Sequence, residues 1–247
     1  MSEPGSRTEV YRAARGEVLA RIAAACARSG RDPRTVTLVA VSKTVPPDAL
    51  RDAVSAGLDL LGENRVQEAA GKAAEVPGAR WHLVGPLQSN KAHAALQVFD
   101  VIQSVDSVKL GRRLDRLVPE TRPDTRYPVL IQVNVDQDPA KAGFDPGALD
   151  PALGELVELT NLELRGFMTV GRFTADRSEA RRTFAGLREI AGRARSRWPV
   201  VGAELSMGMS DDFEMAIEEG ATVVRIGRAL FGEREAAHVH DGAEHPH

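Results

Sequence analysis

Cysteine and long apolar runs are what this sequence most lacks. The single cysteine, Cys26, excludes a disulfide within the chain and agrees with a reducing compartment. No apolar stretch approaches the roughly 18 residues of a membrane-spanning helix. Residues 1–17 are polar and do not have the basic and apolar regions of a signal peptide. We therefore expect a cytoplasmic protein that is not embedded in a membrane.

Basic blocks and common catalytic motifs are also missing. The 32 lysine and arginine residues are balanced by 35 aspartate and glutamate residues, and basic residues adjoin only in pairs such as Arg181 and Arg182. This pattern argues against binding to nucleic acid or to an anionic membrane. The chain has no G-x-G-x-x-G loop, no G-x-S-x-G turn and no His, Cys or carboxylate cluster with the spacing of metal ligands.

Short apolar runs alternate with segments of helical spacing along the chain. The runs cover residues 36–42, 58–61, 81–84, 101–105, 129–135, 164–170, 200–205 and 222–226. No Gly/Ser linker or change of composition interrupts them, which is typical of parallel strands joined by helices. About 250 residues is also the usual length of a (β/α)8 barrel. We predict an α/β fold, a single (β/α)8 TIM barrel; a doubly wound open sheet is the alternative.

An extra helix is expected before the first strand. Over residues 7–29, apolar residues recur at helical spacing from Val10 to Ala25, which predicts an amphipathic helix. We predict one domain over residues 1–234 and a disordered tail over residues 235–247. The histidines of this tail are irregularly spaced and do not indicate a metal site.

Lys43 follows the first predicted strand. In a barrel, the loops that follow the strands converge on one face and carry the functional site. A partly desolvated amine becomes nucleophilic near neutral pH and can form a Schiff base with a carbonyl. His82, inside the third predicted strand, is instead expected to be an internal hydrogen-bonded histidine. The sequence therefore indicates Lys43 as the reactive group.

Two loops have the composition of a phosphate site. Residues 206–210, SMGMS, follow the seventh predicted strand, and Gly227 and Arg228 follow the eighth. Small residues let backbone amides approach an anion, and hydroxyl groups add donors. Barrels often bind phosphate with these same two loops. Together, the loops predict a phosphate-binding site.

A lysine near a phosphate site predicts a ligand with both a carbonyl group and a phosphate. Two classes fit: the cofactor pyridoxal 5′-phosphate, and a sugar phosphate bound by a Schiff-base aldolase. Arg225 ends the eighth predicted strand, where a cationic donor could face a pyridine nitrogen. An aldolase would place its lysine on a later strand and add carboxylate partners, which we do not find. These observations favour pyridoxal phosphate.

Several segments share their order and spacing with a known family. They are LVAVSKTVP, LGENRVQE, WHLVGPLQSNK, KAGF, RGFMTV and LSMGMSDDFEMAIEEGATVVRIGRALFG. From about residue 10 to residue 234, the chain resembles the YggS/PROSC family, the pyridoxal phosphate homeostasis proteins. The resemblance implies the fold-type III barrel shared with the N-terminal domain of alanine racemase.

The resemblance also implies roles for individual residues. Lys43 would hold pyridoxal phosphate as a Schiff base, Asn64 would lie near its ring, and Arg225 would face the pyridine nitrogen. The expected cofactor-binding residues are Lys43, Asn64, Met168, Ser206, Met207, Ser210, Arg225, Gly227 and Arg228. Arg228 stands where many family members have Thr or Ser, so its guanidinium or its backbone amide would replace a hydroxyl contact.

The implied function is to hold and deliver pyridoxal phosphate in vitamin B6 homeostasis, without catalytic turnover. Apoenzymes that need this cofactor would receive it, and we expect a monomer. The alternative is an amino-acid racemase, which needs a tyrosine from a C-terminal β domain. The tyrosines here, Tyr11 and Tyr127, lie outside the predicted strand ends, so racemisation should be poor. Lys141, after the fifth predicted strand, is either a second amine for cofactor transfer or a solvated loop lysine.

Overall fold

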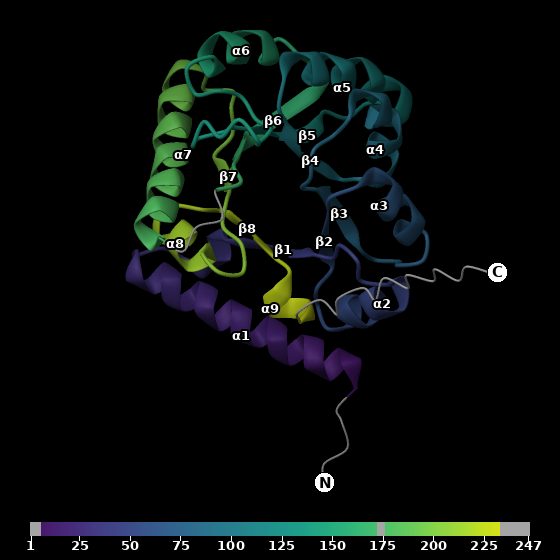
Figure 1. Ribbon diagram of the computed structural model, residues 1–247. Coiled ribbons are helices and arrows are strands. Elements are labelled where there is room, and N and C mark those ends of the chain that lie inside the picture. Colours follow the sequence, from purple (N-terminus) through teal and green to yellow (C-terminus); the bar gives the residue numbers. More distant parts are fainter. Residues whose placement is uncertain (1–5, 172–175, 233–247) are drawn as a thin grey trace, which may run out of the picture.

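The chain forms a closed barrel of parallel strands (Figure 1). The computed structural model describes residues 6–171 and 176–232. The strands are β1 (Thr37–Val41), β2 (Leu60–Glu63), β3 (Arg80–Leu83), β4 (Val101–Val105), β5 (Tyr127–Gln132), β6 (Leu162–Met168), β7 (Glu204–Ser206) and β8 (Val223–Ile226). Each strand pairs with the next, and β8 pairs with β1. The predicted (β/α)8 barrel is confirmed, and the open sheet is wrong.

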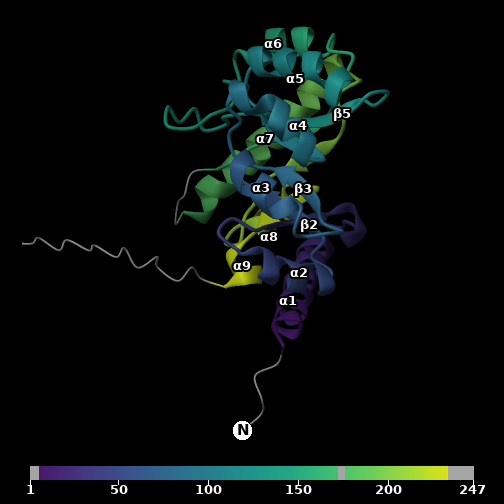
Figure 2. The same ribbon diagram turned by 90° about the vertical axis from the view of Figure 1, so that its right-hand side faces the viewer.

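Helices surround the ring of strands (Figures 1 and 2). They are α1 (Arg7–Arg28), α2 (Pro47–Ser55), α3 (Val66–Ala73), α4 (Ala92–Val98), α5 (Val108–Thr121), α6 (Leu149–Leu156), α7 (Arg177–Arg197), α8 (Phe213–Glu218) and α9 (Arg228–Phe231), with 3-10 turns η1 (Pro33–Thr35) and η2 (Ser89–Lys91). The predicted extra helix is α1, which packs outside the ring against α2, α8 and α9. Within residues 6–171 and 176–232, no helix combines the length and apolarity that crossing a membrane requires.

The described part of the chain ends at residue 232. The tail predicted over residues 235–247 lies outside the described residues. The domain limit at residue 234 likewise stays a prediction. What the structure describes is one barrel with its surrounding helices.

The pairing of β1 with β8 joins the first and last strands. Val39 lies opposite Arg225 in the register of this pair. Because the strands are parallel, their carboxyl ends lie on the same face of the barrel. A Cβ atom on Gly227 would lie only 3.3 Å from the carbonyl oxygen of Val41. The loop that contains Lys43 therefore lies beside the loop after β8, although the two are far apart in the sequence.

Local signals explain where α1 begins and which side it buries. The Glu9 amide donates to Ser6 Oγ at 3.4 Å, and the Ser6 amide donates to the Glu9 side chain at 2.9 Å, forming a capping box. The buried face consists of Tyr11, Val18, Ile22, Ala25 and Cys26. The prediction that Val10 belongs to this face is wrong, because its side chain is 57% exposed. Tyr11 is buried instead, since its ring packs edge-on against Phe231 with 5.5 Å between ring centroids.

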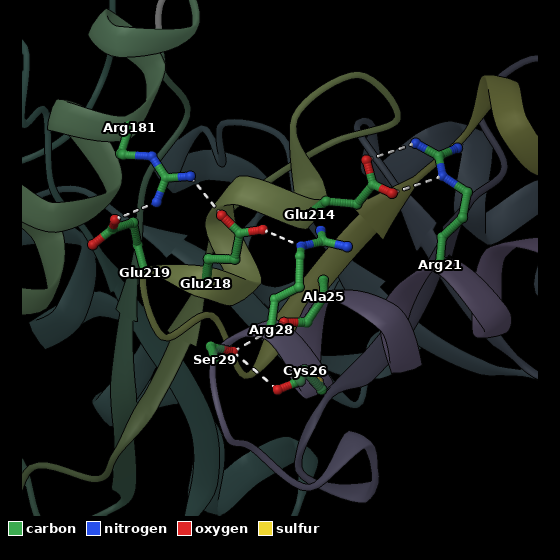
Figure 3. Close-up of polar contacts among 9 residues, drawn as sticks. All are labelled: Arg21, Ala25, Cys26, Arg28, Ser29, Arg181, Glu214, Glu218 and Glu219. Carbon is green, nitrogen blue, oxygen red and sulfur yellow. Dashed lines mark hydrogen bonds and ion pairs between the residues drawn. The ribbon is translucent and has the colours of Figure 1, made fainter.

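Ion pairs connect α8 to both α1 and α7 (Figure 3). Arg21 of α1 pairs with Glu214 at 3.2 Å. Arg28 of α1 and Arg181 of α7 both pair with Glu218. Exposed pairs of this kind contribute about 0–1 kcal/mol each, so their main effect is to fix which surfaces meet. They connect the extra helix α1 to the helix that follows β7.

A chain of hydrogen bonds crosses the inside of the barrel. Arg225 of β8 donates to Ser206 Oγ of β7 at 2.6 Å, and Ser206 donates to Gln103 Oε1 of β4 at 2.6 Å. The Gln103 amide nitrogen lies 2.8 Å from His82 Nδ1 of β3. Burial, reinforced by two nearby arginines, lowers the pKa of His82 to about 3, so the ring is neutral and its Nδ1 accepts from Gln103. The prediction of an internal, hydrogen-bonded His82 is confirmed.

The neutral state of His82 predicts a dependence of stability on pH. Its pKa rises on unfolding from about 3 to the ordinary 6.5, so the unfolded chain binds more protons in this range. The stabilisation is complete above pH 6.5 and is lost as the pH falls toward 3. As the pH is lowered, the free energy of unfolding should fall more steeply in the unmutated protein than in His82→Asn. The two slopes should differ by up to about 1.4 kcal/mol per pH unit.

Urea denaturation at a series of pH values from about 7 to about 4 measures this difference. The control is His93→Asn, which changes an exposed histidine of α4 and should keep the slope of the unmutated protein. Equal slopes for His82→Asn and the unmutated protein would contradict the assignment of a half-buried, neutral ring.

Packing of α1 against the barrel makes a second prediction. Ile22 is 2% exposed, whereas Leu19 on the same helix is 36% exposed. Ile22→Ala should lower the free energy of unfolding by about 2–5 kcal/mol, because it leaves a cavity in the core. Leu19→Ala should change it by about 0.5 kcal/mol or less. Urea denaturation compares the two, and equal losses would show that α1 is not held by its buried face.

Candidate functional site

A cavity of about 490 Å³ lies at the carboxyl ends of the strands. It is lined by Val41, Lys43, Asn64, Val84, Gly85, Pro86, Val170, Met209, Ser210, Asp211, Arg225, Gly227 and Arg228. The structure thus brings together most of the residues predicted from the sequence. The predicted residues in this lining are Lys43, Asn64, Ser210, Arg225, Gly227 and Arg228.

The other three predicted site residues do not line the cavity. Met168 ends β6 and lies opposite Ser206, which ends β7. Both side chains are fully buried, as is that of Met207. Ser206 reaches the site indirectly, because its hydroxyl accepts the hydrogen bond from Arg225. Direct contact of these three residues with a ligand stays a prediction.

Lys43 stands between two cavities. It is half-buried and lies in the turn after β1. A second cavity, of about 370 Å³, has Tyr11 and Phe231 in its lining and also shares Lys43, Gly227 and Arg228 with the first. The lysine therefore contributes to the lining of both cavities, beside the pairing of the first and last strands.

Backbone contacts hold the loops after β7 and β8 together. Gly208 has a φ of +91°, and a Cβ atom there would lie 2.6 Å from a side chain of α8, so glycine is required. The Arg225 amide donates to the Gly208 carbonyl at 3.1 Å. The Ala229 amide donates to Ser210 Oγ at 3.5 Å. The two predicted phosphate loops are thus adjacent and share hydrogen bonds.

Two carboxylates lie in the loop after β7, and both have partners. Asp211 pairs with Arg228 of the neighbouring loop. Asp212 accepts a hydrogen bond from the Met209 amide at 2.6 Å, while burial raises the pKa of its carboxyl group. Helix α8 begins one residue later, at Phe213. The negative charges near this loop are therefore offset by a guanidinium and a backbone donor.

Arg225 supplies a fixed positive charge at the bottom of the cavity. Its side chain is 4% exposed and donates to Ser206 Oγ at 2.6 Å and to the Thr169 carbonyl at 2.8 Å. Burial lowers the pKa of Arg225 to about 10, which leaves the group charged at neutral pH. A guanidinium has five N–H donors, so further donors remain for a ligand.

Apart from Met209, which lies in the predicted phosphate loop 206–210, the sequence did not single out the apolar part of the lining. It consists of Val41, Val84, Pro86, Val170 and Met209. Val84 belongs to a small cluster with Val39 and Leu60 that is separate from the main core. A Cβ atom on Gly85 would lie 2.4 Å from the Asn64 carbonyl oxygen, so this glycine lets the loops after β2 and β3 approach. Val41 and Val84 both lie within predicted strands, but an apolar run does not reveal which of its residues face a cavity.

The cavity combines an amine, a guanidinium, loop donors and an apolar wall. Such a lining suits a flat ring with an anionic group and an electrophilic carbon. Lys141 lies nearby, because its amine donates to the carbonyl of the lining residue Val170 at 3.2 Å. Across residues 6–171 and 176–232, no group of His, Cys, Asp or Glu side chains is arranged to hold a metal ion.

Comparison of the sequence with known proteins gives consistent matches. Residues 19–235 match the family described as alanine racemase, N-terminal domain. A protein of Pseudomonas aeruginosa named pyridoxal phosphate homeostasis protein is 47% identical over 223 residues, covering 89% of this chain and 94% of the relative. The protein of the same name from Escherichia coli K12 is 40% identical over 227 residues, with 89% and 94% covered.

Solved structures agree with these matches. PipY of Synechococcus elongatus, determined with pyridoxal phosphate bound, has 42% sequence identity and a TM-score of 0.76, covering 85% of this chain and 100% of PipY. An alanine racemase of Clostridium difficile has 13% identity and a TM-score of 0.68, covering 89% of this chain and 56% of the racemase, and so shares the fold alone. The chain therefore belongs to the family of pyridoxal phosphate homeostasis proteins, whose barrel is that of the alanine racemase N-terminal domain.

Proposed function

We propose that this chain binds pyridoxal 5′-phosphate as a Schiff base on Lys43 and holds and delivers the cofactor without catalytic turnover. One observation carries the proposal: Lys43, Arg225 and the loops after β7 and β8 line the same cavity. An aldehyde, a ring nitrogen and a phosphate each have a matching group there. These are an amine, a cationic donor, and a set of hydroxyl, amide and guanidinium donors.

Lys43 acts as a reversible tether. Its amine condenses with the aldehyde carbon, so that a C=N bond replaces the C=O bond and one water molecule leaves. Addition of water, or exchange with another amine, reverses this step and frees the cofactor. When bound, pyridoxal phosphate supplies an aldehyde and a ring that can accept electrons. A cationic Arg225 at the ring nitrogen would keep that nitrogen unprotonated and weaken this electron sink, which suits a carrier better than a catalyst.

The phosphate is held by the loops after β7 and β8. Ser210 Oγ accepts a hydrogen bond from the Ala229 amide, so its own O–H is available to donate to an anion. Gly227 leaves its backbone uncovered by a side chain, and Arg228 has more N–H donors than its contact with Asp211 uses. This set of hydroxyl, amide and guanidinium donors supports phosphate binding by the two loops.

The relatives support the same proposal. Two of them carry the name pyridoxal phosphate homeostasis protein, and PipY has been determined with pyridoxal phosphate bound. We extend this binding to the present chain, with apoenzymes that need the cofactor as its recipients. Lys141, at the edge of the cavity, is the candidate for a second amine during transfer.

Racemase activity is the alternative, and the positions of the tyrosines disfavour it. Tyr127 begins β5, far from the carboxyl face, and its hydroxyl donates to the Phe99 carbonyl at 2.6 Å. Tyr11 lies on α1, and burial raises the pKa of its hydroxyl. The charged groups that act on this hydroxyl belong to α1 and α2 and not to the main cavity. Neither residue is a proton donor at the bottom of the site, as two-base racemisation requires.

Reduction with borohydride tests the tether. After incubation with pyridoxal phosphate and reduction, peptide mass spectrometry should find the cofactor on Lys43 in the unmutated protein and no adduct at this position in Lys43→Ala. Lys109→Ala, which changes an exposed lysine of α5, should be modified on Lys43 like the unmutated protein. Modification of Lys141 alone, or of no lysine, would contradict the proposal.

Exchange of hydrogen tests the absence of turnover. With pyridoxal phosphate and L-alanine in deuterated water, the protein should exchange the α-hydrogen no faster than the same concentration of free cofactor. The reason is that neither of the two tyrosines, Tyr11 and Tyr127, is among the described residues that line the main cavity. Proton NMR measures the loss of the α-hydrogen signal. Exchange well above the free-cofactor rate, abolished in Lys43→Ala, would instead support an enzyme.

A further inference from the structure

The turn that contains Lys43 has a conformation that few residues adopt. Thr44 has a φ of +68°, in the left-handed region that disfavours side chains with a branched Cβ. The turn closes with a hydrogen bond from the Val45 amide to the Ser42 carbonyl at 3.0 Å. Such a conformation persists only where the surrounding structure holds it, and it often marks a functional site.

Two side chains of α3 hold the backbone on both sides of Lys43. Lys72 Nζ donates to the carbonyl oxygen of Ser42 at 3.0 Å. Glu68 Oε1 accepts a hydrogen bond from the Thr44 amide at 2.7 Å. Lys72 and Glu68 also pair with each other at 2.8 Å, one turn apart on the helix. The residues before and after the lysine are therefore fixed to the same helix.

A buried carboxylate lies beneath this pair. Glu63 at the end of β2 is 0% exposed, and its Oε1 accepts from Lys72 Nζ at 2.7 Å and from Ser42 Oγ at 2.8 Å. Its Oε2 has no hydrogen-bond partner among the described residues. Burial raises the pKa of Glu63. Burial alone would raise that of Glu68 too, but the hydrogen bonds from Lys72 and from the Thr44 amide lower it.

Stabilisation of the fold does not by itself explain the cluster of Glu63, Glu68 and Lys72. Buried ion pairs often stabilise no more than apolar residues of similar size, because both charges lose their hydration. Here one acceptor oxygen is also left unpartnered. What the cluster does achieve is orientation, since its contacts end on the backbone of the two residues that flank Lys43.

We propose that Glu68 and Lys72 are positioning residues that hold the Lys43 turn so that its amine stays at the cavity. The inference rests on the proposed function of Lys43 and adds the means by which the tether is oriented. Condensation with an aldehyde needs the amine in one region of space, and a turn held in advance loses less freedom when the bond forms. Among the described residues, Glu68 and Lys72 hydrogen-bond to the Lys43 turn, to Glu63 and to each other, and not to the loops after β7 and β8. Loosening the turn should therefore weaken the covalent step and leave phosphate binding intact.

The experiment compares two ligands on the Glu68→Ala variant. Pyridoxal 5′-phosphate can condense with Lys43, whereas pyridoxine 5′-phosphate has a hydroxymethyl group in place of the aldehyde and cannot. Removing the charged acceptor of the Thr44 amide should weaken formation of the borohydride-stable Lys43 adduct about tenfold. The Kd of pyridoxine phosphate, measured by calorimetry, should not change. Glu68→Gln, which keeps an acceptor oxygen, should lie between Glu68→Ala and the unmutated protein.

Controls separate positioning from loss of folding. Glu155→Ala removes one partner of an exposed ion pair between α6 and α5, and it should bind both ligands like the unmutated protein. Unchanged adduct formation in Glu68→Ala, or equal weakening of both ligands, would overturn the inference. Lack of an adduct in the unmutated protein and in Glu155→Ala as well would overturn the proposed function itself, and the inference with it.

Discussion

The hydrogen bonding of β1 to β8 is the constraint on which the candidate site depends. Val39 lies opposite Arg225 in this pair, so the last residues of the two strands share one rim. In an open sheet with the strands in this sequence order, they would lie at opposite edges. Closure places Lys43 close to Gly227 and Arg228, and these three residues line both cavities.

Buried charges give the site its rigidity. Arg225 is held by Ser206 and by the Thr169 carbonyl, and the hydrogen bonds continue across the barrel to His82. Polar groups removed from water are costly unless they are hydrogen-bonded, so each such network admits few alternative arrangements. By contrast, the pair between Arg228 and Asp211 is exposed and can rearrange around a ligand. The part of the cavity formed by Arg225 is therefore rigid, whereas the part formed by Arg228 and Asp211 can adjust to a ligand.

The sequence predicts the fold well because its signal is local. Each predicted strand overlaps an observed one, and residues that directly follow predicted strands, such as Lys43 and Gly227, do line the cavity. Orientation is harder to predict, because successive residues of a strand point to opposite sides and both sides of a parallel barrel are apolar. For this reason the sequence indicates Met168 and not Val41, although Val41 lines the cavity and Met168 is buried outside its lining. The contact of Lys72 with the Lys43 turn could not be predicted from the sequence, since it arises only when α3 packs beside β2 and the turn after β1.

A crystal structure of the protein grown with pyridoxal 5′-phosphate tests the central claim most directly. The account predicts continuous electron density between Lys43 Nζ and the aldehyde carbon of the cofactor. It also predicts the phosphate beside Ser210 and Gly227, with Arg225 at the ring nitrogen. Cofactor density joined to another lysine, or a phosphate bound away from the loops after β7 and β8, would contradict it.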